Sequence, residues 1–483
     1  MKTTYSFGIS LAVALAFGAC SSDNNNTPVS EVVLKSHSVT PALVKKLSGF
    51  DNLEVFSLIG SDDKLPQSPN FVFGGSADGA GFLKNTDGTF TALVNHEDNF
   101  AVSRITFDKT FKPVKGEYLL NSDGGQWRLC SATLATPQEH GFGPLFLTCG
   151  ESGIESRTHA IDPYAPITSA NVSKEQAGLG RWSAENAVPL PKTAYANKTV
   201  ILIGDDDSGS GAGQLAMYVA NTVGDLNNGE LYVMKRKDQN TRERDMTANG
   251  TKHEVEFVKI TDHKTLTGSQ INTVANEMKA IRFGRVEDID YRKGSTGREV
   301  YFNVTGQNNT GNNADNSRTK YGRVYRLLLD ANDATKGTLE VVLDGDDRNG
   351  KAKEFQNIDN ICVTQNYVYT QEDPNGYGDE THDSYIYQYN IATGELKKVI
   401  ELDHRRTATD AAKYNVGGTS KFGDWEYGAM VDISDVVGIP NTFAICIQPH
   451  TWTGDAYKGV DGGKLRPNEN QASQIVIIKG LAK

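Results

Sequence analysis

Pairs of short β-strands that carry polar or metal-capable residues recur along the chain, and this repeat constrains the fold more than any other feature of the sequence. In each copy a short strand carries a polar or metal-capable residue, and a strongly apolar strand further on ends in another. A recurring unit of this kind is the signature of a repeat architecture. The six pairs are Asp78 with Glu97, Cys130 with Glu151, Glu185 with Asp205, Glu287 with Thr305, Asp359 with Glu372, and Glu426 with Gln448.

Most copies are followed by hairpins rich in Tyr, Val and Leu. Residues 322–345 and 384–403, for example, each hold two such strands around a turn that contains glycine. Each unit therefore supplies about four strands. The 48 glycines of the chain suit a β-protein with many turns. The sequence predicts an all-β fold, a six-bladed β-propeller, in which matching positions of the blades meet around a central channel with metal sites.

Acids at the ends of strands have two interpretations. For any single pair they are adequately explained as turn formers. Six pairs in register instead bring carboxylates together, where they repel one another and require protons or cations. Calcium suits such a set because it accepts many oxygen ligands. Cys130, as a thiolate, is a softer ligand and indicates a transition metal, with iron or zinc as the main candidates, so more than one kind of metal is expected.

The first twenty residues have the features of an export signal. One basic residue precedes an apolar run over 7–16 and small residues ahead of Cys20. The run is too short to span a membrane. We predict a lipoprotein signal peptide over 1–19, an acylated Cys20 with a flexible tether over 20–45, and a single β-propeller catalytic domain over 46–483. Ordinary secretory cleavage is the alternative.

Export determines the expected location and the state of the cysteines. The lipid anchor would hold the protein at the outer membrane or cell surface, with the periplasmic side as an alternative. In an oxidising compartment the four remaining cysteines could pair in three ways. Disulfides are the ordinary expectation, and a functional cysteine among them is the alternative. The four residues are Cys130, Cys149, Cys362 and Cys446.

The charge of the chain narrows the choice of partners. The formal net charge of -11 argues against nucleic acid, whose recognition usually requires a basic face. An acidic protein that handled an anionic substrate would need bound cations to reverse the local field. The sequence contains no nucleophile elbow, zincin helix, EF-hand loop or Walker sequence that would indicate another chemistry.

Taken together, these motifs resemble the PhoX-type alkaline phosphatases, a family of exported six-bladed propellers. The matching segments occur in the family's order and span most of the mature chain. They are NHE (95–97), CSATLATP (130–137), LTCGE (147–151), GRWSAEN (180–186), GDD (204–206), FGRVED (283–288), IDN (358–360) and IQPH (447–450).

The resemblance implies a metal centre that holds Fe3+ and Ca2+. The implied iron ligands are Glu97, Cys130, Glu185 and Glu287. The implied calcium ligands are Glu151, Asp205, Asp206 and Asp359. Arg285 lies two residues before Glu287 and therefore on the same face of a strand, and the resemblance makes it the catalytic phosphate clamp.

The leading hypothesis is metal-dependent hydrolysis of phosphate monoesters for phosphate scavenging, by a monomer that acts on small phosphorylated substrates. Two alternatives stay open. One is a non-catalytic calcium-binding propeller that binds a surface glycan or protein. The other is a related phosphodiesterase or lactonase.

Overall fold

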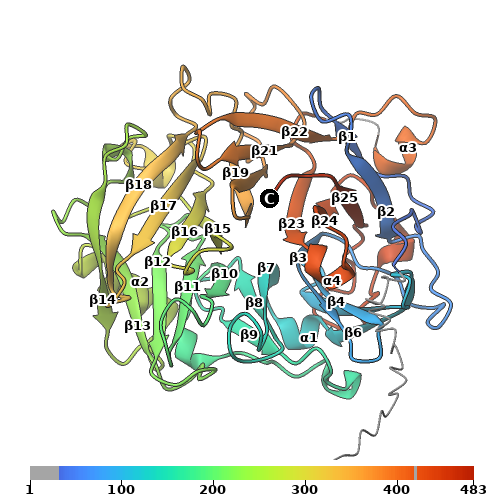
Figure 1. Ribbon diagram of the computed structural model, residues 1–483, viewed down its shortest axis with the longest axis horizontal. Helices are drawn as coiled ribbons and strands as arrows, with labels where there is room; N and C mark the ends of the chain where they lie inside the picture. The colour runs from blue at the N-terminus through green and yellow to red at the C-terminus, as the bar shows by residue number, and fades with distance from the viewer. Residues whose placement is uncertain (1–31, 418–420) are drawn as a thin grey trace, which may run out of the picture.

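Antiparallel β-sheets arranged around a common axis make up the protein (Figure 1). The computed structural model describes residues 32–417 and 421–483, and within these residues twenty-five strands form five sheets. The predicted signal peptide, Cys20 and the tether as far as residue 31 lie outside the described residues. The prediction of an all-β, propeller-like arrangement is confirmed.

Four of the sheets are separate blades of three to five strands. The first has the order β3 (Ala77–Lys84), β4 (Phe90–His96), β5 (Ala101–Phe107), β6 (Pro113–Leu120). The second has the order β7 (Arg128–Ala135), β8 (Leu145–Glu151), β9 (Thr158–Ile161). The third has the order β19 (Ile358–Val363), β20 (Tyr367–Glu372), β21 (Tyr385–Asn390), β22 (Leu396–Leu402), β1 (Val44–Lys46). The fourth has the order β23 (Glu426–Asp432), β24 (Thr442–Gln448), β25 (Gln474–Lys479), β2 (Glu54–Gly60).

The fifth sheet has nine strands and corrects the expectation of six separate blades. Its two ends, β10 and β15, lie next to each other, so the sheet nearly closes on itself. The cause is an outer-edge pairing, because β14 pairs with β18 over residues 253–256 and 336–339. The order is β10 (Ala184–Pro189), β11 (Thr199–Asp205), β12 (Leu215–Ala220), β13 (Glu230–Arg236), β14 (His253–Ile260), β18 (Lys336–Asp344), β17 (Arg323–Leu329), β16 (Glu299–Val304), β15 (Val286–Tyr291).

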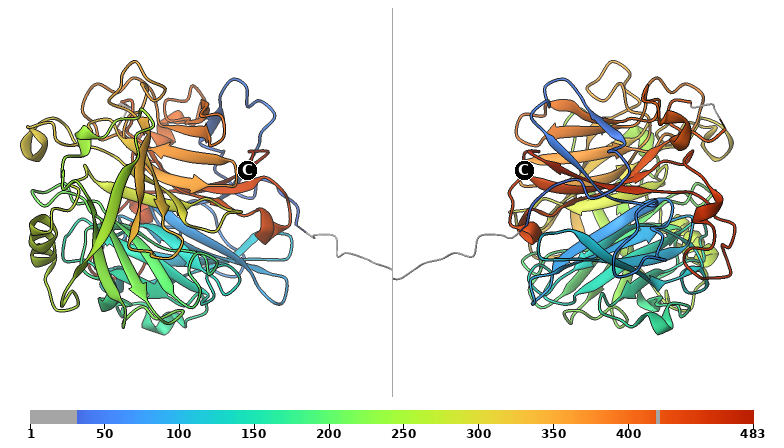
Figure 2. Two further views of the ribbon diagram at one scale, coloured as in Figure 1. Left: turned by 60° about the vertical axis from the view of Figure 1, so that its left-hand side comes forward. Right: turned by 90° about the vertical axis from the view of Figure 1, so that its right-hand side faces the viewer.

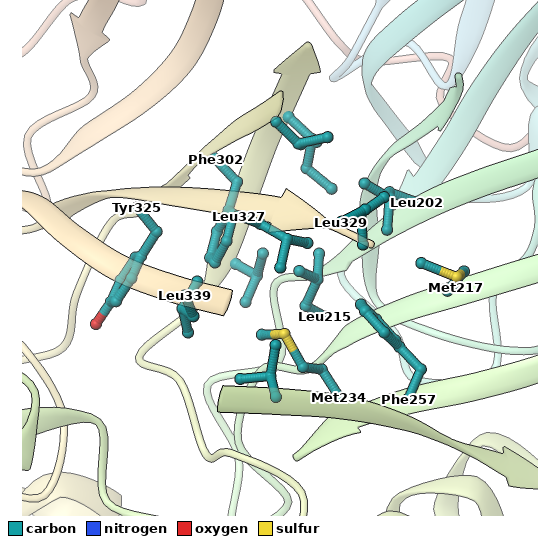
Figure 3. Packing of buried hydrophobic residues seen from close by; sticks show 14 of the residues in the cluster. Leu202, Leu215, Met217, Met234, Phe257, Phe302, Tyr325, Leu327, Leu329 and Leu339 are labelled. Carbon is teal, nitrogen blue, oxygen red and sulfur yellow. The ribbon is translucent and has the colours of Figure 1, made fainter. Parts of the chain in front are cut away.

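A large apolar core fills the space enclosed by the nine-stranded sheet (Figure 3). Met217 and Phe257 from one half of the sheet belong to the same buried cluster as Phe302 and Tyr325 from the other. The rings of Phe302 and Tyr325 stack with their centroids 5.0 Å apart. Because this burial removes apolar surface of both halves from water, it holds them together around their shared edge.

Six strands form a closed ring at the axis. Each inner strand contacts the next in the order β3, β7, β10, β15, β19 and β23, and β23 contacts β3 again. The ring is closed at its outer side by β2, which pairs with β25 and so joins an early strand to the last one (Figure 2). The start of each inner strand therefore faces the same channel.

The described part of the expected tether lies on the sheets. β1 pairs with β22, and the backbone N–H of Val39 donates to Asp63 Oδ1 at 2.8 Å. Ser36 Oγ accepts from the backbone N–H of Ser57 at 3.1 Å. Residues of the segment 32–45 thus contact the propeller through these bonds.

Helices are short and lie in the connections. The longest of them, α2, begins with a capping box between Thr267 and Gln270. Within the described residues no helix is long and apolar enough to cross a bilayer. The helices are α1 (Ser122–Gly125), α2 (Gly268–Glu277), α3 (Ala411–Tyr414) and α4 (Ser434–Val437), with 3-10 turns at Ile167–Ser169, Ala177–Leu179, Glu243–Asp245, Gly311–Asn313 and Asp455–Tyr457.

The expected disulfides do not form between the described cysteines. Cys130, Cys149, Cys362 and Cys446 are all free and buried. Cys149 in β8, Cys362 in β19 and Cys446 in β24 belong to three different sheets, which keep these three cysteines apart.

Close packing between neighbouring inner strands leads to a first prediction. A Cβ at Gly204 would lie 2.4 Å from the carbonyl oxygen of Glu287 on the next inner strand. We expect Gly204→Ala to lower the free energy of unfolding by about 1–3 kcal/mol, because the backbone of β15 has to move. Gly454→Ala is the control, since its nearest neighbour would be the Tyr457 ring at 3.3 Å. Denaturant unfolding of both variants checks this, and an equal effect of the two would contradict it.

Candidate metal centre

A β-bulge interrupts every inner strand at the same place. In each of the six inner pairs, two residues of the inner strand oppose one residue of its partner. A bulge re-aims the side chains beside it and is common next to functional sites. The bulged residues are Asp78 and Gly79, Cys130 and Ser131, Glu185 and Asn186, Glu287 and Asp288, Asp359 and Asn360, and Gly428 and Ala429.

The first residue of the bulge is a possible metal ligand in five of the six strands. In the sixth it is Gly428, where a Cβ would lie only 2.5 Å from the carbonyl oxygen of Ala77. There the carboxylate comes from Glu426, two residues earlier on the same strand. The bulge thus explains why a carboxylate such as Glu185 stands inside a buried strand.

These side chains converge on a cavity of about 260 Å³ in the channel. Its lining is almost entirely polar, and it includes six of the eight metal ligands expected from the sequence. The lining residues are Asp78, Glu97, Arg128, Cys130, Glu151, Ser152, Glu185, Arg285, Glu287, Asp359, Asp373, Glu426, Gln448 and His450.

Nine of the lining residues, here called the candidate ligands, form four overlapping groups of three. In each group the potential ligand atoms lie within 4.8 Å of one another. Cys130 belongs to two groups, and the other two contain only carboxylates. The groups are Asp78 with Cys130 and Glu185, Glu97 with Cys130 and Glu151, Glu185 with Glu287 and Asp359, and Asp359 with Asp373 and Glu426.

Burial and mutual repulsion disfavour the ionised forms of these acids. Burial raises the pKa of Glu97 to about 7, and the charge of Asp98 adds to the effect. Burial raises the pKa of Glu151 to about 8, with Asp206 as the next cause. The pKa values of Asp78, Glu185 and Asp359 are all raised well above the usual range, first by burial and then by neighbouring carboxylates.

Cys130, which belongs to two of the groups, is a neutral thiol in the metal-free protein. Its Sγ donates to Glu151 Oε2 at 3.1 Å. Burial raises the pKa of the thiol well above its usual range, and Glu151 and Glu185 reinforce the shift. Because a cysteine binds a metal as its thiolate, a cation that binds Cys130 has to displace the thiol proton.

Two arginines partly offset the negative charge. Arg285 donates from Nε to Asp206 Oδ1 at 2.6 Å, and its Nη2 lies 3.0 Å from Glu287 Oε1. Its backbone adopts φ 74°, a left-handed conformation that is uncommon for a non-glycine residue and clusters at functional sites. The arginine expected to clamp a phosphate therefore lies at the cavity and is held by acids on two sides.

Arg128 occupies the corresponding position of another inner strand and was missed in the sequence. It precedes Cys130 by two residues, as Arg285 precedes Glu287. Its guanidinium contacts Glu97 Oε1 at 2.5 Å and Asp98 Oδ1 at 2.9 Å. The shared two-residue offset is the signal that would have identified it.

Three acids at the ends of the partner strands β11 and β20 do not line the cavity. Asp205 is buried opposite Ala184 and does not line the cavity. Asp206 does not line it either but binds Arg285. Glu372 accepts hydrogen bonds from the backbone N–H of Tyr385 and from Tyr387, and its neighbour Asp373 enters the cavity instead.

His450 and Glu426 form an ion pair at the edge of the cavity. His450 Nε2 lies 3.0 Å from Glu426 Oε1, and its Nδ1 lies 2.6 Å from Gln471 Oε1. Burial alone would lower the pKa of His450, but Glu426 and Gln471 raise it to about 10. The imidazolium is thus a third positive group beside the candidate ligands.

Comparison with known proteins bears on the fold. No protein-family profile matches the chain, and no curated protein matches it in sequence. Among solved structures, Pseudomonas fluorescens PhoX in complex with vanadate, a transition state analogue, has a TM-score of 0.60 at 14% identity, with 92% of this chain and 98% of that chain covered. This likeness shows that the chain has a PhoX-like propeller fold.

Two further solved structures score much lower. The PQQ-bound aldose sugar dehydrogenase from Streptomyces coelicolor has a TM-score of 0.38 at 10% identity, covering 89% of this chain and 99% of that one. An α-L-arabinofuranosidase from Fusarium graminearum, with an iminosugar inhibitor, has a TM-score of 0.37 at 11% identity, covering 87% and 96%. Scores this low carry no argument about function.

The raised pKa values predict how the stability of the metal-free protein depends on pH. Glu97 and Glu151 keep their protons in the folded state up to pH values of about 7 and 8, whereas the unfolded chain releases them near its usual values. The folded state thus binds more protons, and the free energy of unfolding has to fall as the pH rises through this window. Thermal unfolding of chelator-treated protein should give a lower Tm at pH 8.5 than at pH 5.5.

A matched variant identifies the groups responsible. Replacement of both residues by glutamine removes the two titrations and should flatten this dependence. A Tm that rises with pH in the metal-free protein, or a slope unchanged in the double variant, would contradict the assignment.

Proposed function

We propose that this protein is a metal-dependent phosphomonoesterase whose active site is the cavity at the six bulges. The observation that carries the proposal is the convergence of nine candidate ligands and two arginines on one small cavity of the channel. The PhoX-like fold supports it, because PhoX, which has a similar fold, forms a complex with vanadate, a transition state analogue. If the two halves of the nine-stranded sheet are counted as two blades, the propeller has six blades.

The candidate ligands suit the two metals of the proposal, Fe3+ and Ca2+. The groups that contain Cys130 combine a thiolate with carboxylates, a donor set for a transition metal such as iron. The groups of Glu185, Glu287, Asp359, Asp373 and Glu426 contain only oxygen ligands and suit calcium. Asp78 Oδ1 and Asp359 Oδ1 are buried without a protein partner, as expected of atoms that bind a cation.

The bound cations supply positive charge that turns an acidic cavity into an anion site and polarises a phosphoryl group. Arg285 is oriented by Asp206, Glu287 and Asn375, so its remaining N–H groups meet a phosphate oxygen without reorganisation. Arg128, about one third exposed, faces the same cavity from another inner strand. The volume of about 260 Å³ and the polar lining favour a phosphoryl group, while the alcohol part of the ester stays outside.

The proposal includes the protein's setting. We propose export with acylation of Cys20, attachment to the outer membrane or cell surface, and a monomer that acts on small phosphorylated substrates. The residues that would carry the anchor lie outside the described part of the chain.

Activity depends on the fork geometry of Arg285. In protein supplied with Ca2+ and Fe3+, Arg285→Lys should lower kcat/KM for an aryl phosphate by about 100-fold, because the three donors of a lysine sit on one nitrogen and cannot reproduce the planar fork that reaches both acids and a phosphate oxygen. Arg292→Lys is the control, since Arg292 pairs with Glu299 away from the cavity. The proposal fails if the parent protein hydrolyses no aryl phosphate above the level of Glu287→Ala.

Metal analysis of the purified protein separates the enzyme from a calcium-binding propeller. We expect iron together with calcium in the parent, and loss of iron with retention of calcium in Cys130→Ser, because the serine hydroxyl is a poor ligand for iron. Elemental analysis by mass spectrometry measures both. Calcium without iron, with a Cys130→Ser protein like the parent, would favour the non-catalytic alternative.

A further inference from the structure

A second ring of residues surrounds the candidate ligands. In each inner pair, one residue of the partner strand lies opposite the bulge. None of these residues lines the metal cavity. They are Asn95, Cys149, Gly204, Asn303, Gln371 and Cys446, so three of the six are side-chain amides.

Two of the amides bind the bulge of the next inner strand where it presents a candidate ligand. Asn95 donates to the carbonyl oxygen of Cys130. Asn303 donates to the carbonyl oxygens of Asp359 at 2.7 Å and Asn360 at 2.9 Å. A bulge leaves its carbonyls outside the regular ladder, and the amides take the place of the missing backbone donors.

The third amide makes the same bond to a bulge that presents no ligand. Gln371 donates to the carbonyl oxygen of Gly428 at 2.7 Å. Gly428 has no side chain, and the carboxylate of that strand comes from Glu426. The chain therefore contains one internal comparison, in which an amide opposite the bulge donates to the carbonyl of the first bulge residue in both strands, and only one of those residues is a candidate ligand.

The amides are not explained by packing alone. Asn303, Asn95 and Gln371 are fully buried, and the side-chain oxygen of each lacks a protein partner although the nitrogen donates. Burying such an oxygen costs free energy that an apolar side chain of the same size would avoid. The need for the N–H donor has to outweigh this cost.

We propose that Asn303 is a positioning residue for the metal centre, which fixes the bulge of β19 so that the Asp359 carboxylate points at the cations. Asn95 has the same role for Cys130. Asp359 belongs to two of the four groups of candidate ligands, so a rotation of its bulge disturbs both. This inference rests on the proposed metal centre, and outer-shell residues that orient ligands are known to affect metal affinity strongly.

The test compares Asn303→Leu with Gln371→Met in the full chain. Both substitutions keep the approximate size of the side chain and remove amide-to-bulge hydrogen bonds, two at Asn303 and one at Gln371. Both should therefore lower the Tm of the metal-free protein, Asn303→Leu by more than Gln371→Met. Calorimetric titration of the chelator-treated proteins with Ca2+ should then show a dissociation constant about 10-fold higher for Asn303→Leu and near the parent value for Gln371→Met.

A milder variant applies if Asn303→Leu does not fold. Thr370 Oγ1 also accepts from the Asn303 amide, at 2.9 Å. Thr370→Val loosens the amide and should weaken Ca2+ binding in the same direction, by less than Asn303→Leu. Parent-like Ca2+ affinity in the Asn303 and Thr370 variants, or an equal loss in Gln371→Met, would overturn the inference.

The outcomes separate this inference from the proposed function. If the parent binds Ca2+ but hydrolyses no phosphate ester, the proposed reaction fails while the affinities still decide the role of Asn303. If the parent hydrolyses esters and the variants bind Ca2+ alike, the positioning role fails and the reaction stands. A parent that binds no Ca2+ would overturn both.

Discussion

The structure depends on the repulsion between carboxylates that six strands bring to one axis. Burial and neighbouring carboxylates raise the pKa values of Asp78, Glu185 and Asp359 well above the usual range, so the set cannot be ionised together without compensating charge. Arg128, Arg285 and His450 supply part of that charge, but each is paired with acids of its own. The remaining excess has to be met by protons or by cations.

The β-bulge is the device that allows a propeller to present such a set. A regular inner strand would alternate its side chains between the faces of the sheet and offer only backbone edges to the axis. One extra residue in each inner strand turns a side chain inward, and the partner strand supplies an amide, a thiol or a glycine opposite the insertion. Where that partner is Gly204, close backbone contact with β15 takes the place of a hydrogen bond.

Much of this was visible in the sequence, because the strand pairs and their polar ends are local features. Cys130, Glu185 and Asp359 were found in this way. Each bulge also leaves a local mark that was not used, two consecutive small or polar residues between apolar ones, as in Ala184-Glu185-Asn186-Ala187. At Glu372 the position was one residue too early, because Glu372 lies opposite Ile358 and the next residue, Asp373, lines the cavity.

The features that the sequence did not reveal arise from contacts between distant segments. The pairing of β14 with β18 joins two blades at their outer edges, and no local pattern marks which edges will meet. The cysteines follow the same principle for Cys149, Cys362 and Cys446, which lie in three different sheets and stay free. Local periodicity reports which residues face inward, whereas pairing between sheets depends on the assembled ring.

Backbone conformation links the ring to its chemistry. The residue two positions before the bulge ligand is left-handed at Ser76, Asn357 and Arg285, three equivalent places in different inner strands. Such conformations cost free energy, as do the unpaired acids, and both costs are present before any cation binds. A cation that binds only the folded ring relieves the repulsion, so its binding free energy adds directly to the stability of the fold. The residues that make the metal-free channel unfavourable are therefore the same ones that give it affinity for metals.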